Sequence, residues 1–168
     1  MNAVDILKYG HSFVVGNVNG LPEEAWHTPI VGVWSVKDLI AHLASFEQIL
    51  VELLGTFQGK METPTLAAFQ ASHAQFNDDE VERRQHLSAS EVWAEYEAAH
   101  QQNIALMESI GLDERRALGT LPWYGPEYSL EDFIVYSFYG HKREHGAQID
   151  MYRAQLSSEV NFGAGSVV

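Results

Sequence analysis

The stretch YSLEDFIVYSFYGHKREHGAQI, residues 128–149, decides the fold class of this chain. Ser129 is followed three residues later by Asp132, which is a variant of the capping box that begins a helix. Residues on one face then recur at intervals of three or four positions. The pattern therefore predicts a long helix over residues 130–156.

Two histidines, His141 and His145, stand four residues apart in this predicted helix. This spacing places both imidazoles on one helix face, so that they can bind one ion together. A third histidine, His42, lies in VWSVKDLIAHLASFE, residues 33–47, on another helical stretch. Two ligands from one helix and one from a neighbour leave coordination positions open, as a catalytic metal site requires.

The same signals predict three further long helices. Ser35 with Asp38, and Ser88 with Glu91, are two more capping-box patterns. Gly111 is a suitable C-terminal stop for the helix that Ser88 begins. The predicted long helices span residues 4–19, 36–57, 89–110 and 130–156.

These four amphipathic helices, without strand-like alternation, predict an all-α four-helix bundle. The connection between the second and third helices is too long for a hairpin, so we expect a crossover that carries short helices of its own, near residues 64–75 and 77–84. The predicted domain covers residues 1–158, and residues 159–168 are expected to form a C-terminal tail.

Composition limits the classes of function. The chain has 168 residues, 46% of them hydrophobic, which is enough for one domain with a core. A formal net charge of −13 argues against nucleic-acid binding. There is no cysteine, so the chain can form no disulfide and can offer no cysteine thiolate to a metal. No signal-peptide pattern or membrane-spanning apolar stretch is recognised, and a cytoplasmic protein without a membrane partner is expected.

Three neutral imidazoles suit Zn²⁺, Ni²⁺, Fe²⁺ or Cu²⁺ better than Mg²⁺ or Ca²⁺. An ion held in this way lowers the pKa of bound water or binds an anionic ligand such as a thiolate. Asp38, one turn before His42, can orient that imidazole or serve only as a capping residue. Glu144 can reach the site or remain a solvated helix residue. They are the candidate catalytic residues, because no separate general base stands out.

The alternative is that the three histidines are core residues paired with backbone or carboxylate groups. That interpretation is preferred for His11 and His100, each of which stands alone on an apolar face. Trp34, Trp123 and Tyr124 lie where loops meet the second and fourth helices. They either form the wall of a substrate pocket or serve only in packing.

With these motifs in place, the chain resembles the DinB-like superfamily of four-helix bundles. Its members carry W-S-x-x-[DE]-x-x-x-H-L on the second helix and H-x-x-x-H-x-x-Q on the last, which correspond here to residues 34–43 and 141–148. The stretch at residues 76–100 resembles relatives near the mycothiol-dependent isomerases. LPWYGPEYSLEDFI, residues 121–134, resembles the DfsB and colibactin-resistance branch.

The resemblance covers about residues 4–156. It implies a divalent metal on His42, His141 and His145, followed by Gln148, and a homodimer. It further implies metal-dependent transfer of a low-molecular-weight thiol, or hydrolysis, with a small electrophilic compound as substrate and detoxification as the role. The alternative is a binding or sequestration protein of the DfsB-like branch. Since that branch can lack the histidines, their presence favours a metal-binding member.

Overall fold

A computed structural model describes residues 2–163, in which helices predominate. The main helices are α1 (Ala3–Val18), α2 (Val36–Thr56), α5 (Ala89–Ser109) and α8 (Gly140–Gly163). The shorter elements are η1 (Glu23–His27), β1 (Pro29–Val31), β2 (Trp34–Ser35), α3 (Pro64–Ala71), α4 (His73–Arg83), α6 (Leu112–Arg116), α7 (Leu130–Phe133) and η2 (Ile134–Tyr139). The all-α four-helix fold is confirmed.

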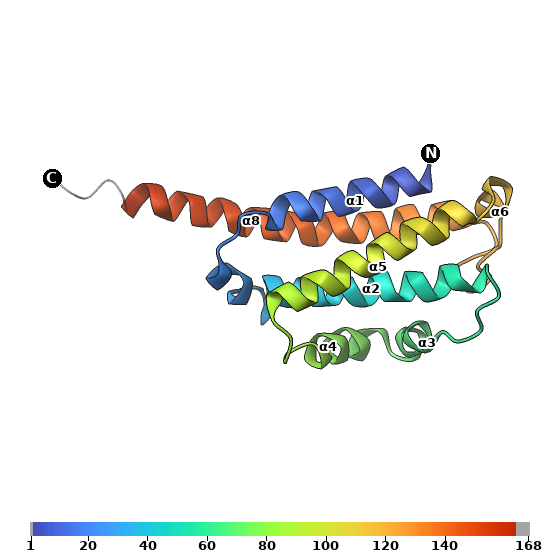
Figure 1. The fold of residues 1–168 in the computed structure, drawn as a ribbon, viewed down its shortest axis with the longest axis horizontal. Coiled ribbons are helices and arrows are strands. Elements are labelled where there is room, and N and C mark those ends of the chain that lie inside the picture. The colour runs from blue at the N-terminus through green and yellow to red at the C-terminus, as the bar shows by residue number, and fades with distance from the viewer. Residues whose placement is uncertain (1, 164–168) are drawn as a thin grey trace.

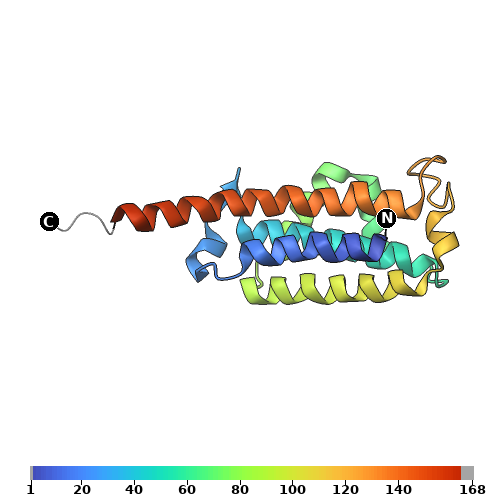
Figure 2. The ribbon, with the colours of Figure 1, turned by 90° about the horizontal axis from the view of Figure 1, so that it is seen from above.

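The four long helices form two parallel pairs (Figures 1 and 2). α1 packs against α8, and both run in one direction, whereas α2 packs against α5 and both run in the other. Because α2 and α5 are parallel neighbours, the chain must return along the whole bundle between them. The predicted crossover makes this return, and its helices α3 and α4 pack on the outer side of α2.

The three predicted capping boxes are present. The hydroxyl groups of Ser35, Ser88 and Ser129 accept hydrogen bonds from the backbone amides three residues on, and the acidic side chains at those positions bind back to the caps. Each box satisfies backbone amides that the first turn of a helix leaves without partners. These local signals explain why the helix starts agree closely with the sequence.

The structure also contains elements that the sequence did not predict. A two-stranded antiparallel sheet pairs β1 with β2 around a turn at Gly32, whose φ is +58°. Strands this short show no alternation that could reveal them. The last helix begins as α7, continues as the π-helix η2 and becomes α8.

The predicted tail only partly matches the described chain. α8 continues to Gly163, past the predicted helix end near Leu156 and into residues 159–163. Residues 164–168 lie outside the described part. The domain boundary after residue 158 stays a prediction.

Two glycines allow α1 and α8 to approach closely. A Cβ atom on Gly146 would stand 2.6 Å from the ring of Phe13, and one on Gly10 would stand 3.2 Å from Lys142. Asn17 also donates a 2.9 Å hydrogen bond to the Gly146 carbonyl. Gly10 lowers the helix propensity of α1, but its missing side chain allows a close contact between α1 and α8.

α2 is the core helix of the bundle. Among the described residues, it is the one helix long and apolar enough to cross a membrane, yet 83% of its apolar window is buried inside the protein. Its apolar side chains belong to both clusters of the core. This is the behaviour of a central helix in a soluble-protein-like fold, and the cytoplasmic location stays a prediction.

Candidate metal centre

The structure brings together the three histidines that the sequence singled out. His42 comes from α2, and His141 and His145 come from the first turns of α8. The Nε2 atom of His141 lies 2.8 Å from that of His42 and 2.9 Å from that of His145. We call these three residues the histidine cluster. One nitrogen from each ring lies within 4.8 Å of the other two, as metal ligands do.

Burial keeps two of these imidazoles neutral. His42 is 3% exposed, and burial together with His145 lowers its pKa from 6.5 to about 3. Burial, with His42 and His145 next in importance, lowers the pKa of His141 to about 2. A histidine must be neutral to offer a lone pair to a cation, so both are ready to bind metal at ordinary pH.

Gln148 fixes the tautomer of the third histidine. Nδ1 of His145 lies 2.8 Å from the Gln148 amide oxygen, one turn further along α8. Since an amide oxygen accepts, Nδ1 carries the proton and the lone pair of neutral His145 lies on Nε2. Such a partner on the far side of the ring is the usual support of a histidine ligand.

The short contacts between nitrogen atoms inside the histidine cluster cannot all be hydrogen bonds. With its Nδ1 proton directed at Gln148, His145 offers a lone pair at Nε2, and Nε2 of His141 has either one proton to donate or one lone pair to accept with, so it cannot bond to both of its neighbours. One nitrogen contact is therefore left unsatisfied, while Nδ1 of His42 is buried without a partner among the described residues. A divalent ion at the convergence of the Nε2 atoms would use the lone pairs, so the residues fit a metal.

The two carboxylates predicted to assist are placed elsewhere. Oδ2 of Asp38 accepts from the backbone and hydroxyl of Ser35, and Oδ1 accepts from Gln85, so this side chain caps α2 and does not contact His42. Glu144 is exposed and makes no hydrogen bond or ion pair with the described histidines. Asp38 binds the nearby Ser35 at the start of its own helix, and it therefore does not extend to the imidazole of His42.

A pocket of about 600 Å³ opens beside the histidine cluster, as in many ligand sites. Two of the predicted pocket residues, Trp123 and Tyr124, form part of its wall. The third, Trp34, is not among the residues that line this pocket, and its ring lies 5.1 Å from that of His42. The structure thus places two of the three aromatic residues at the pocket and one against a histidine of the cluster.

A second polar cluster lies in the bundle interior and was missed in the sequence. The Lys142 Nζ atom lies 2.5 Å from Oε1 of Glu47, and Asn103 donates to Oε2 of the same carboxylate at 2.9 Å. His100 lies 3.5 Å from Oε2. We call Glu47, His100, Asn103 and Lys142 the ion-pair cluster. The available signal was Glu47, a charged residue inside the apolar run of α2.

The ion pair decides the charge state of Glu47. Burial alone would raise the pKa of Glu47, but the Lys142 ammonium and His100 outweigh burial and lower that pKa from 4.5 to about 2. Both side chains of the pair are 1–2% exposed. The carboxylate is thus held ionised in the core by its partners.

Comparison with known proteins now places the chain in a family. The model of the DinB superfamily matches residues 14–149. The chain is a member of the DinB superfamily. The matched range includes the whole histidine cluster, a group that could hold a metal ion. No functionally curated protein matches the chain.

Among solved structures, the colibactin self-resistance protein ClbS, crystallised in complex with a dsDNA, has the same fold. The TM-score is 0.72, the sequence identity is 14%, and the match covers 89% of this chain and 91% of ClbS. At that identity, the likeness shows a shared fold and not a shared activity.

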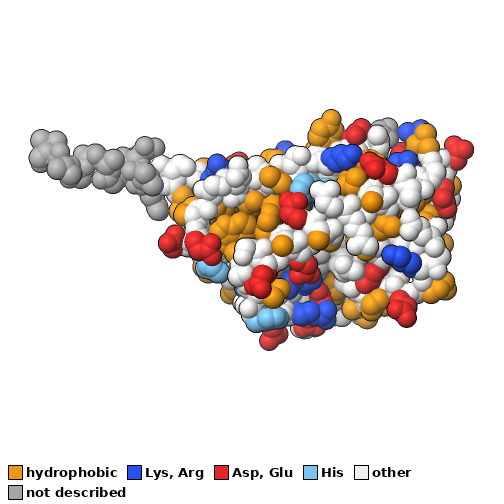
Figure 3. All heavy atoms as spheres, viewed as in Figure 1, with side chains coloured by type: hydrophobic (Ala, Val, Ile, Leu, Met, Phe, Trp, Pro, Cys, Tyr) orange, Lys and Arg blue, Asp and Glu red, His pale blue; other side chains and the backbone are white. Residues whose placement is uncertain are grey.

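This finding corrects one sequence-based prediction. The net charge of −13 predicts that nucleic acid is excluded as a partner, and this prediction is wrong because ClbS, which has the same fold, was crystallised in complex with a dsDNA. A charge summed over the chain does not decide DNA binding, since phosphate contacts depend on where the cations lie. On the face in Figure 3, basic side chains are scattered among acidic ones.

Proposed function

We propose that this protein is a divalent-metal-dependent enzyme, a thiol S-transferase or hydrolase, that acts on a small electrophilic compound. The observation that carries the proposal is the convergence of three histidine Nε2 atoms, at 2.8 and 2.9 Å, beside a pocket of about 600 Å³. A role in detoxification is part of the same proposal.

His42, His141 and His145 would hold the ion, and Gln148 would orient His145. Zn²⁺, Ni²⁺ and Fe²⁺ are the candidate ions, because imidazole suits all three. Bound there, the ion would supply Lewis acidity, which lowers the pKa of the water or thiol that it binds. Three protein ligands leave positions open for such a molecule.

A binding protein without turnover is the second candidate. The observation that favours it is the absence of a nearby base: among the described residues, no carboxylate contacts the histidine cluster, and Asp38 serves as a cap. Catalysis by proton transfer needs a group within hydrogen-bond reach of the substrate. A binding protein would use the same ion and pocket to hold a small molecule.

Metal analysis followed by turnover assays tests the proposal. The purified protein is stripped, reloaded separately with Zn²⁺, Ni²⁺ and Fe²⁺, and assayed with low-molecular-weight thiols and an aryl halide or an ester. We expect stoichiometric metal and turnover in the wild type, and neither in His141→Ala. The exposed His86→Ala serves as the matched control and should behave as the wild type.

Three results are informative. Turnover that depends on the histidines supports the enzyme. Metal-dependent binding of the electrophile without product supports the binding protein. A wild-type protein that takes up none of the three ions contradicts both, and leaves the histidines with a structural role.

A further inference from the structure

We propose that the pocket beside the histidine cluster binds the uncharged aromatic body of the substrate, and that the crossover helices α3 and α4 form its cover. This inference rests on the proposed function and specifies its substrate class. The walls come from four parts of the chain: α2, the crossover, the loop before α7, and the last helix. Among the described residues that line the pocket, none is Asp, Glu, Lys or Arg, and His73 is the single side chain that can carry a charge. The walls therefore favour an uncharged ligand.

Phe46 connects the pocket to the histidine cluster. Its ring lies 4.4 Å from that of His141 and 4.8 Å from that of His42, measured between centroids. On its other side, it packs 5.3 Å from Phe69 of α3, inside the pocket. The ring of Phe46 alone therefore separates this wall of the pocket from His42 and His141.

Aromatic side chains dominate the walls. Trp123, Tyr124 and Phe133 stack edge to face with one another, at centroid distances of 4.8–6.2 Å. Across the pocket, Phe69 stacks flat on His73 at 4.3 Å. Aromatic rings favour such offset and edge-on contacts, and a pocket lined with them selects a flat aromatic ligand.

Ser137 gives the pocket a polar group on the side of the histidine cluster. It lies in the π-helix η2, four residues before His141, is half-buried and makes no hydrogen bond with the described residues. π-helical turns are frequent at functional sites. An unpaired hydroxyl at this wall favours a ligand whose polar, reactive end points towards the histidines.

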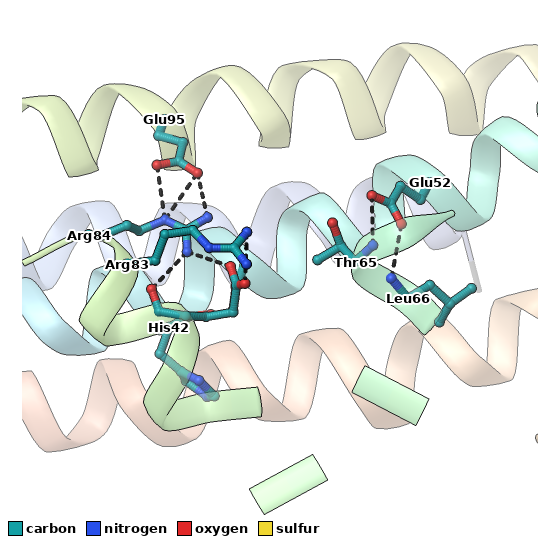
Figure 4. A network of polar contacts seen from close by, with 9 residues as sticks. His42, Glu52, Thr65, Leu66, Arg83, Arg84 and Glu95 are labelled. Carbon is teal, nitrogen blue, oxygen red and sulfur yellow. Dashed lines mark hydrogen bonds and ion pairs between the residues drawn. The ribbon is translucent and has the colours of Figure 1, made fainter. Parts of the chain in front are cut away.

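The cover is tied to the bundle at both ends (Figure 4). At the start of α3, the buried carboxylate of Glu52 accepts from the amides of Thr65 and Leu66 at 3.2 and 2.9 Å. After the end of α4, Arg84 binds Glu80 of its own helix and Glu95 of α5. These contacts fix the ends of the crossover on α2 and α5.

The middle of the cover is held only by apolar packing. Within the described chain, residues 67–79 make no hydrogen bond or ion pair with another element. Phe69 and Phe76 pack on Phe46 instead, and α3 and α4 join at Ser72. The segment that can part most easily from the bundle therefore lies directly over the pocket.

The test uses metal-free protein and N-phenyl-1-naphthylamine, an uncharged aromatic fluorophore. We expect saturable binding to the wild type, at least tenfold weaker binding to Trp123→Ala and to Gln70→Trp, and no change in Trp26→Ala. Trp26 is a matched control because it lines a separate hollow between η1 and α5. Gln70 is exposed at the pocket, so a tryptophan there blocks the space without disturbing the core.

Charge selectivity and the histidine variant complete the test. The sulfonated analogue 1-anilinonaphthalene-8-sulfonate should bind at least tenfold more weakly than the neutral dye. His141→Ala should lose metal uptake but keep dye binding, so a failure of the metal site is distinguished from a failure of the pocket. Equal binding of the two dyes, or wild-type affinity in Trp123→Ala and Gln70→Trp, would overturn the inference.

Discussion

The histidine cluster and the ion-pair cluster are two groups of buried polar side chains in one bundle, and they differ in how their charges and lone pairs are matched. In the ion-pair cluster, the carboxylate of Glu47 receives an ammonium and an amide, and charge meets opposite charge. In the histidine cluster, ring nitrogens face ring nitrogens and one contact is unsatisfied. Each cluster keeps one buried polar atom without a partner among the described residues, Oδ1 of Asn103 and Nδ1 of His42. The ion-pair cluster nevertheless matches its charges internally and stabilises the fold, whereas the facing ring nitrogens of the histidine cluster have capacity left for a ligand.

The comparison is sharpest at two consecutive residues. His141 joins the histidine cluster, and Lys142 joins the ion-pair cluster. Lys142 is 1% exposed and fully inside the bundle, while His141 is half-buried near the pocket. Two consecutive residues of α8 thus belong to two different clusters, and they differ in burial.

The largest expected effect comes from breaking the ion-pair cluster. Glu47→Ala leaves Lys142 buried without its partner, which costs about 3–5 kcal/mol in the free energy of unfolding. Urea denaturation followed by circular dichroism measures this change. The double variant Glu47→Leu/Lys142→Met, which removes both charges, should recover most of the loss. An equal loss in both variants would mean that the ion pair itself matters little.

Acid should weaken the same cluster. The pKa of Glu47 is lowered from 4.5 to about 2 in the folded protein, so its contribution is fully present above pH 4.5 and is lost as the pH falls through about 2. By linkage this contribution is about 3 kcal/mol. Denaturation midpoints between pH 5 and pH 2 should fall less in Glu47→Leu/Lys142→Met than in the wild type. Parallel curves would contradict the assignment.

Metal addition should stabilise the protein through the histidine cluster alone. At a free metal concentration of about 100 times Kd, the wild type should gain about 2.7 kcal/mol. His141→Ala should gain nothing, whereas Glu47→Leu/Lys142→Met should gain as much as the wild type. Thermal melts with and without Zn²⁺ or Ni²⁺ measure the gain. Stabilisation of His141→Ala would show that the ion binds elsewhere.

The smallest effect is expected from the partner of His145. Gln148→Leu removes the acceptor that fixes the tautomer, and such changes weaken metal binding about 10–100-fold. Gln148→Glu, which keeps an acceptor oxygen, should retain the affinity. Gln155→Leu, an exposed position on the same helix, serves as the control. Competition with a chromophoric chelator measures all three, and unchanged affinity in Gln148→Leu would remove this residue from the site.

Local patterns in the sequence explain what could be predicted. The capping boxes at Ser35, Ser88 and Ser129 use residues three apart, and they located the starts of three long helices. His141 and His145 share a helix face because of their spacing, so their proximity could also be predicted. The crossover followed from loop length alone.

What could not be predicted depends on contacts between distant segments. The partner of Lys142 lies on α2, and no periodicity on α8 points to it. The π-helical turn shifts the helix phase, so the buried line passes through Phe138 and Lys142 rather than Ser137 and His141. Asp38 had two plausible partners, and only the structure decides for the cap.

Because α2 and α5 are parallel, the helices that carry the histidines and the segment that covers the pocket are different parts of the chain. The three histidines are carried by α2 and α8, whereas the cover over the pocket, α3 and α4, belongs to residues 57–88, the return path that a parallel pair requires. Insertions, deletions and substitutions in that return path alter the walls of the pocket and leave the ligand-bearing helices intact. Residues 57–88 are thus the segment in which sequence changes, in evolution or by design, can alter the pocket without changing the helices that carry the histidines.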